Sequence, residues 1–270
     1  MRLALLAFYS QRTHTLHMTL IKLDGFTPAP KTPQHRRLIA SIEGAPKTGK
    51  THWALDTPGP IAVFCFDKGL EGVVEKFAQT DIVVREFDFM PPIQGEKEDT
   101  IKAEASKLLD AFTTAYHKAL VCAPLRTVVI DSGTMVWALV RAARFGKVQG
   151  VMPLKYAIAN AVMDRLVRAG HESEKSVIWT HEIKPVYIND SRTGAYERDG
   201  YKAMGYAVQA NFATDYDAKQ AGDERFGLQI RDCRQNMMLA GQTARGELAR
   251  FQNLAPMIFP GTSPADWGAK

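Results

Sequence analysis

Short apolar runs alternate with longer stretches of helical periodicity along the first half of the chain. The apolar run Leu38–Ile42 leads through a glycine-rich turn into Lys50–Leu55, a pattern that predicts strand, loop and helix. A second, buried strand is predicted at Ile61–Phe66, and alternation with β-branched residues predicts a third strand at Ile82–Phe89, with a helical pattern over Leu70–Phe77 between them. The chain therefore begins as an α/β unit.

The middle of the chain continues the same alternation. Apolar residues recur at the spacing of one helix face from Glu98 to Leu120, and the β-branched run Thr127–Ile130 then ends at Asp131. Three more elements are predicted after it: helices over Met135–Arg144 and Tyr156–Ala169 and a strand over Ser176–Thr180. Strands joined by helical crossovers predict an α/β fold with a largely parallel central sheet flanked by helices.

The last third of the chain is less regular. Glu182–Gly205 mixes Gly, Asn, Asp, Pro and Tyr without periodicity, which predicts a long excursion with room for a hairpin, and Phe226–Ile230 is the last clear strand. Prolines 256, 260 and 264 predict an irregular end. We therefore expect an irregular N-terminal extension over residues 1–33, one core over 34–252 and a tail over 253–270.

Composition narrows the class of protein. The 270 residues are 46% hydrophobic and 23% charged, typical of one large globular core, and the net charge of +5 is compatible with a polyanionic partner. Three cysteines without paired spacing favour neither a disulfide framework nor a zinc site, and fit a reducing cytoplasm. No apolar run approaches the roughly 20 residues that span a bilayer, so no membrane partner is expected. The segment MRLALLAFYSQ resembles a weak signal-peptide core without a cleavage site, and Met18 is an alternative start.

One octapeptide carries specific chemistry. The sequence GAPKTGKT follows a predicted strand, opens a predicted helix and matches the phosphate-binding P-loop. Its members are Gly44, Ala45, Pro46, Lys47, Thr48, Gly49, Lys50 and Thr51. Backbone N–H groups would cradle the phosphates of ATP, Lys50 would bridge the β- and γ-phosphates, and Thr51 would bind Mg²⁺. Asp131 would complete the magnesium site from the end of a neighbouring strand.

Five segments together resemble the RecA-like branch of P-loop ATPases: GAPKTGKT, FDKG, TVVIDS, VIWTH and FGLQIRDCR. More closely, they are similar to phage-encoded ATP-binding proteins of the single-strand annealing and recombination type. The resemblance covers about Leu38 to Asn236. It implies ATP hydrolysis with Mg²⁺, single-stranded DNA as partner, a homo-oligomeric ring or filament in the bacterial host cytoplasm, and a single-strand-binding protein as a further candidate partner.

The resemblance also implies site residues. A catalytic carboxylate should follow the second strand, where Asp67 is present but Gly69 replaces the expected glutamate, which leaves Asp67 or Glu71 as candidates. His181 occupies the position that senses the γ-phosphate. Arg231 and Arg234 occupy the place of basic residues that reach the nucleotide of a neighbouring subunit.

Two basic segments fall where RecA-like proteins have DNA-binding loops. Basic and aromatic residues interleave in the second, which suits backbone contacts and base stacking, although acidic residues dilute its charge. The candidates are Arg144, Lys147 and Lys155, then Lys184, Tyr187, Arg192, Tyr196, Arg198, Tyr201 and Lys202. Two other functions use the same P-loop and stay open: a small-molecule or nucleotide kinase, and a nucleotide-dependent motor or switch that does not touch DNA.

Overall fold

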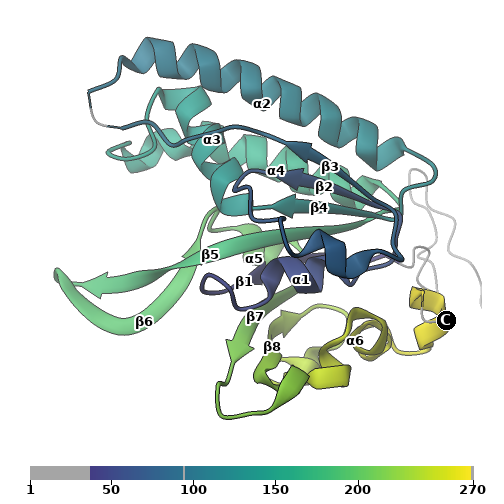
Figure 1. Cartoon of the computed structure of the whole chain (residues 1–270). Coiled ribbons are helices and arrows are strands. Elements are labelled where there is room, and N and C mark those ends of the chain that lie inside the picture. Colours follow the sequence, from purple (N-terminus) through teal and green to yellow (C-terminus); the bar gives the residue numbers. More distant parts are fainter. Residues whose placement is uncertain (1–36, 94, 269–270) are drawn as a thin grey trace, which may run out of the picture. The chain divides into compact units, whose positions relative to one another are not determined.

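A mixed sheet forms the centre of the protein (Figure 1). The computed structural model describes residues 37–93 and 95–268, so the predicted extension and Met18 lie outside the described residues. The strands follow the order β3-β2-β4-β5-β1-β7-β8-β9, and β6 pairs with β5. Their bounds are β1 Ile39–Glu43, β2 Ile61–Cys65, β3 Ile82–Glu86, β4 Thr127–Asp131, β5 Ser176–Ile188, β6 Ser191–Asp199, β7 Ala210–Tyr216, β8 Phe226–Cys233 and β9 Thr243–Arg245.

The strands from β3 to β7 in this order are parallel, and β8 and β9 continue the sheet in antiparallel fashion. Helices supply most of the crossovers that parallel pairing requires. The predicted α/β class with a largely parallel sheet is therefore confirmed. Because β1, β4 and β5 are neighbours, their carboxyl ends bring Glu43, Asp131 and His181 to one edge of the sheet.

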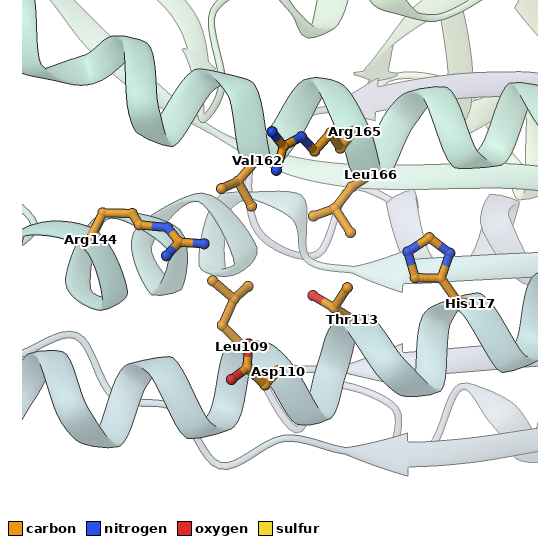
Figure 2. A pocket seen from close by; sticks show the side chains of 8 residues that line it. All are labelled: Leu109, Asp110, Thr113, His117, Arg144, Val162, Arg165 and Leu166. Carbon is orange, nitrogen blue, oxygen red and sulfur yellow. The ribbon is translucent and has the colours of Figure 1, made fainter.

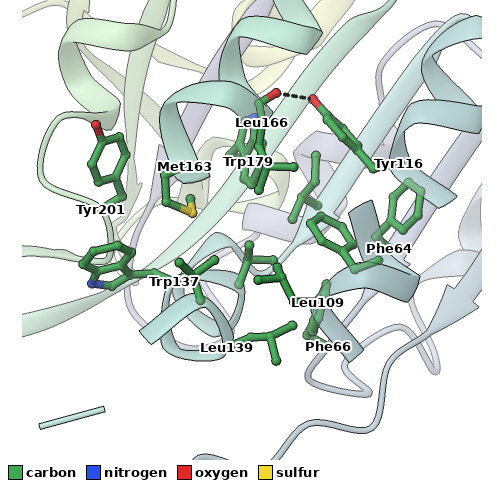
Figure 3. Close-up of a cluster of buried hydrophobic side chains, with 14 of the residues drawn as sticks. Phe64, Phe66, Leu109, Tyr116, Trp137, Leu139, Met163, Leu166, Trp179 and Tyr201 are labelled. Carbon is green, nitrogen blue, oxygen red and sulfur yellow. Dashed lines mark hydrogen bonds between the residues drawn. The ribbon is translucent and has the colours of Figure 1, made fainter. Parts of the chain in front are cut away.

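Three long helices cover one face of the sheet: α2 (Glu98–Val121), α3 (Gly133–Phe145) and α4 (Tyr156–Glu172). Their apolar faces pack on alternate strand residues such as Phe64 and Trp179, as Figure 3 shows. Within this core the Tyr116 hydroxyl donates to the Leu166 carbonyl at 3.1 Å, so the buried polar group is satisfied.

The opposite face is covered by α1 (Lys50–Leu55) and α6 (Phe251–Ile258). Trp53 of α1 packs between Phe212 and Phe251, with ring centroids 5.0 and 5.8 Å away. The prediction of an irregular tail was wrong here, because one face of α6 is apolar and its burial outweighs the cost of Pro256 inside the helix. Trp267 is buried beyond it.

Three other elements differ from the sequence pattern. β7 was not predicted, because its Ala, Asn and Asp residues have low strand propensity. Pairing with β1 and β8 on its two sides stabilises the strand. Residues 70–77 form turns rather than a regular helix, and the helix α5 (Met204–Ala207) precedes β7. Short 3₁₀ turns complete the chain at Val74–Phe77, Pro153–Lys155, Gly222–Arg225, Met237–Leu239, Gly246–Ala249 and Pro264–Trp267.

Candidate nucleotide-binding site

The P-loop joins β1 to α1 at the carboxyl edge of the sheet. The Gly44 amide donates to the His181 carbonyl at 3.2 Å, which ties the start of the loop to β5. A Cβ atom at Gly44 would lie 1.8 Å from Thr214 Oγ1, so any larger residue there would force the Thr214 side chain to move. Gly49 has φ of +96°, which side chains rarely adopt. Both motif glycines thus suit the packing and the conformation of the loop.

The Lys50 side chain folds back over the P-loop. Its ammonium donates to the carbonyls of Gly44 at 3.0 Å and Ala45 at 2.8 Å. Burial lowers the pKa of Lys50, and the carboxylates of Asp131, Glu182 and Asp67 oppose that shift. The lysine charge therefore lies in the loop among three carboxylates, the first of which belongs to the predicted magnesium site.

Asp131 and Thr51 meet as the sequence predicts. Thr51 Oγ1 donates to Asp131 Oδ2 at 2.8 Å, and Thr180 Oγ1 donates to the other carboxylate oxygen. Burial and the nearby Asp67 raise the pKa of Asp131, while the two hydroxyls and Lys50 act in the opposite direction. Thr180 was not predicted from the sequence, because a single threonine in a strand belongs to no recognisable motif.

The two candidate catalytic carboxylates differ in their surroundings. Asp67 lies two residues beyond β2, is exposed, and accepts a hydrogen bond from the Gly69 amide at 3.0 Å. Its charge acts on both Lys50 and Asp131. Glu71 is exposed and is not among the charges that shift the pKa of either group. The structure thus places Asp67, rather than Glu71, beside the P-loop.

The His181 ring is fully buried, and only the backbone carbonyl of this residue is bonded to the P-loop. A Cβ at Gly133 would approach the ring to 2.5 Å and one at Gly200 to 2.9 Å, so the ring fits between two glycines. Within the described chain its nitrogens have no hydrogen-bond partner. Burial, reinforced by Arg198, holds the pKa of His181 well below its usual value, which keeps the ring neutral.

Glu43, which no sequence motif indicated, immediately precedes the P-loop and holds two of the predicted residues. Its carboxylate pairs with Arg198 Nε at 2.9 Å and with Arg231 Nε at 3.7 Å. Arg198 was predicted to bind DNA, but its side chain is only 14% exposed and is engaged by Glu43, so that prediction is wrong. Arg234 follows β8 directly, and its guanidinium donates to the Tyr206 carbonyl at 2.7 Å.

The segment predicted to bind DNA is largely the β5–β6 hairpin, which projects from the sheet (Figure 1). Tyr187 and Tyr196 are 60% and 51% exposed, and Arg192 lies over the Tyr196 ring at 5.3 Å. Lys184 Nζ lies 3.7 Å from the Glu197 carboxylate and 3.4 Å from the Asp199 carboxylate, so its positive charge is compensated. The exposed aromatic rings are therefore a more distinctive feature of the hairpin than its net charge.

Tyr201 contradicts its predicted role. Its ring is 3% exposed, packs against Trp137 with centroids 5.7 Å apart, and donates its hydroxyl to Asp164 at 2.5 Å. No face of this ring is available to a base, so Tyr201 is a core residue. Lys202 next to it is exposed.

The three basic residues of the other predicted DNA loop have separate surroundings. Arg144 lines a pocket of about 170 Å³ between α2 and α4, together with Asp110, Arg165 and His117 (Figure 2). Lys147 is exposed and pairs with Glu98 at 2.8 Å, and Lys155 is exposed in the turn before α4. The structure does not gather these side chains into one patch.

Comparisons with known proteins give only distant likenesses. No family model matches the chain, and no curated protein matches it. Similar solved structures include RadB recombinase, with 12% identity and a TM-score of 0.44 over 77% of this chain and 86% of that one. A KaiC-like protein from the archaeon Pyrococcus horikoshii OT3 has 14% identity and a TM-score of 0.42 over 80% of this chain and 87% of that one.

Neither of these two structural likenesses is close enough to support a conclusion about function. The functional proposal therefore rests on the residues of the site. Within residues 37–93 and 95–268, no helix combines the length and apolar character needed to cross a membrane.

Proposed function

We propose that this protein is a RecA-like P-loop ATPase that hydrolyses ATP with Mg²⁺. The observation that supports this most directly is the meeting of the P-loop with a buried carboxylate, in which Thr51 Oγ1 and Asp131 Oδ2 are 2.8 Å apart. A hydroxyl and a carboxylate at this spacing suit a magnesium ion that keeps several water ligands. The absence of a side chain at Gly44 lets the loop pack closely against Thr214 of β7, and the backbone N–H groups of such a loop can cradle phosphate.

Each residue then has a defined task. Lys50 and the backbone of the loop would hold the phosphates, while Thr51 and Asp131 would hold Mg²⁺, which would neutralise phosphate charge during transfer. Asp67 would orient the attacking water, a role supported by the effect of its exposed carboxylate on the pKa values of Lys50 and Asp131. Glu182 also affects Lys50 and is the alternative carboxylate.

We further propose that the β5–β6 hairpin binds single-stranded DNA and that subunits assemble as a ring or filament in phage recombination or annealing. Support comes from the exposed Tyr187 and Tyr196 beside Arg192, since aromatic faces and a cation suit base stacking and phosphate contact. β5 reaches the P-loop through the His181 carbonyl, so one strand runs from the nucleotide site to the hairpin.

Replacing Lys50 tests the nucleotide site. Lys50→Ala should abolish measurable phosphate release and weaken ATP binding by at least about tenfold, because the charge that holds the phosphates is lost. The measurements are fluorescent-nucleotide titration and phosphate release, with and without single-stranded DNA, and circular dichroism to show that the variant folds. A folded variant with unchanged affinity and turnover would refute the assignment.

The wild-type protein separates the remaining alternatives. Stimulation of phosphate release by single-stranded DNA favours the proposed function. Transfer of phosphate to a small acceptor would favour a kinase, and turnover that ignores DNA would favour a switch or motor without DNA contact.

A further inference from the structure

A buried polar network lies between the P-loop and the base of the β5–β6 hairpin. Its centre is Glu43, the last residue of β1, which pairs in register with His181 of β5 and Ala213 of β7. The Glu43 side chain is only 11% exposed, yet it is ionisable and immediately precedes Gly44. Charged groups are rarely buried unless they are paired, so its partners define its role.

Arg198 is the main partner of Glu43 and comes from the return strand of the hairpin. It lies on β6 opposite Ile183 of β5, and its guanidinium crosses to β1, where Nε lies 2.9 Å from Glu43 Oε2. β6 pairs only with β5 among the described strands, so this contact joins it to a strand that it does not touch through its backbone.

The Nη2 end of the Arg198 guanidinium is also hydrogen-bonded. Its Nη2 donates to Asn211 Oδ1 at 2.9 Å, and Asn211 in turn donates to Asp232 at 2.8 Å. Ser41 of β1 also donates to Asn211 Oδ1, at 2.6 Å. The arginine is thus held by β1 and β7 together, through the ion pair of its Nε with Glu43 and the hydrogen bond of its Nη2 to Asn211, although Nε itself makes no hydrogen bond of good geometry to any residue that the structure describes.

From this geometry we infer that Glu43 is a positioning residue that, through Arg198, couples the P-loop to the orientation of the β5–β6 hairpin. The inference deepens the proposed function and rests on it. Any shift of the loop that accompanies nucleotide binding begins one residue from Glu43, and the ion pair transmits the shift to β6. This connection is separate from the one through the His181 carbonyl, which acts on β5.

The experiment compares nucleotide responses rather than activities. The DNA probe is a fluorescein-labelled oligo-dT of about 30 nucleotides, and the ratio measured is its Kd without and with a slowly hydrolysed ATP analogue. In the wild-type protein the ratio should lie in the range of about 5 to 150, the usual span of allosteric coupling. Arg198→Met should reduce it to within about twofold of 1, while nucleotide affinity changes less than about threefold.

Two further variants guard against simple misfolding. Glu43→Gln leaves Arg198 buried without its main counter-charge, so the double variant Glu43→Gln with Arg198→Met removes both charges and should fold better than Glu43→Gln alone. The double variant should show the same lost ratio as Arg198→Met, because both act on one connection. Arg245→Met is the matched control, since the ion pair of Arg245 with Asp215 that it breaks joins β9 to β7 and involves no residue of the hairpin, so this variant should keep the wild-type ratio.

A readout without DNA separates this inference from the proposed function. Hydrogen exchange of residues 182–199 should slow when the ATP analogue binds wild-type protein, and should not respond in Arg198→Met. If the exchange responds but no DNA binds, the DNA function fails and the coupling stands. If the folded Arg198→Met variant keeps the wild-type response in exchange or in the Kd ratio, Glu43 and Arg198 do not couple the two sites.

Discussion

At the scale of single residues, Asp131 needs its charge for the proposed magnesium site, but burial of that charge is unfavourable for the stability of the fold. Its carboxylate is buried and its pKa is raised mainly by that burial. A folded-state pKa above the unfolded value means that the folded state binds the proton more tightly. The free energy of unfolding therefore decreases as pH rises through the folded-state pKa of Asp131.

Asp131→Asn should accordingly lower magnesium-dependent phosphate release by about tenfold or more while leaving nucleotide affinity within a few-fold, because Lys50 and the loop remain. The same change should raise the melting temperature at about pH 8, by about 2–4 °C for each kcal/mol gained. The gain should shrink as pH falls, because asparagine resembles the protonated acid. Thermal unfolding over pH and a phosphate-release assay measure both effects.

Asp164→Asn is the matched control, since Asp164 also accepts from a hydroxyl but lies on α4, in the helix layer. It should leave phosphate release unchanged. If Asp131→Asn melts lower than wild type at about pH 8 and loses nucleotide affinity together with turnover, Asp131 has a structural role.

The residues that could be predicted are those whose chemistry fixes their sequence spacing. Gly44, Gly49, Lys50 and Thr51 belong to one continuous loop, and Asp131 ends an apolar strand that any reader of the sequence finds. Glu43 and Thr180 act through contacts with residues far along the chain, so no local pattern marks them.

At the scale of elements, the hairpin should bind DNA through its exposed tyrosines. Tyr196→Ala and Tyr187→Ala should each weaken binding of labelled oligo-dT about 5- to 150-fold if the ring stacks on a base, which corresponds to about 1–3 kcal/mol. Fluorescence anisotropy at low salt with an ATP analogue present measures this. Tyr206→Ala is the control, because that ring is even more exposed but lies on α5.

A loss of affinity in the Tyr206 variant as large as in the hairpin variants would point to general surface effects. Full affinity in the double variant Tyr187→Ala with Tyr196→Ala would exclude the hairpin rings as the stacking platform.

At the scale of elements, local sequence also explains why some helices and strands were not predicted. Strands buried on both faces were predicted, because continuous apolar runs such as Val128–Ile130 have few alternatives. The hairpin and β7 carry mixed polar sequences whose strand conformation depends on pairing. For α6, proline was given more weight than the apolar face that Phe251 and Ile258 present to the core.

At the scale of the whole molecule, the two candidate arginines bear on assembly. Arg231 is half exposed and its Nε faces Glu43 of its own chain at 3.7 Å. Arg234 follows β8, and its amide bonds to the Gln209 carbonyl, which places it near the amino end of β1 rather than beside its own P-loop. An arginine in that position can serve a nucleotide only if the nucleotide belongs to a neighbouring subunit, as arginine fingers do.

The resulting prediction concerns mixtures of inactive subunits. Arg234→Ala and Lys50→Ala should each be inactive alone, since each lacks one half of a composite site. When the two are mixed in equal amounts, about one quarter of the interfaces in a ring or filament join an intact lysine to an intact arginine. DNA-stimulated phosphate release should then recover toward about one quarter of the wild-type rate.

Arg231→Ala in place of Arg234→Ala tests the other candidate in the same way. Size-exclusion chromatography with light scattering must show that the variants assemble together. Co-assembly without recovery at any mixing ratio would mean that neither arginine acts across an interface.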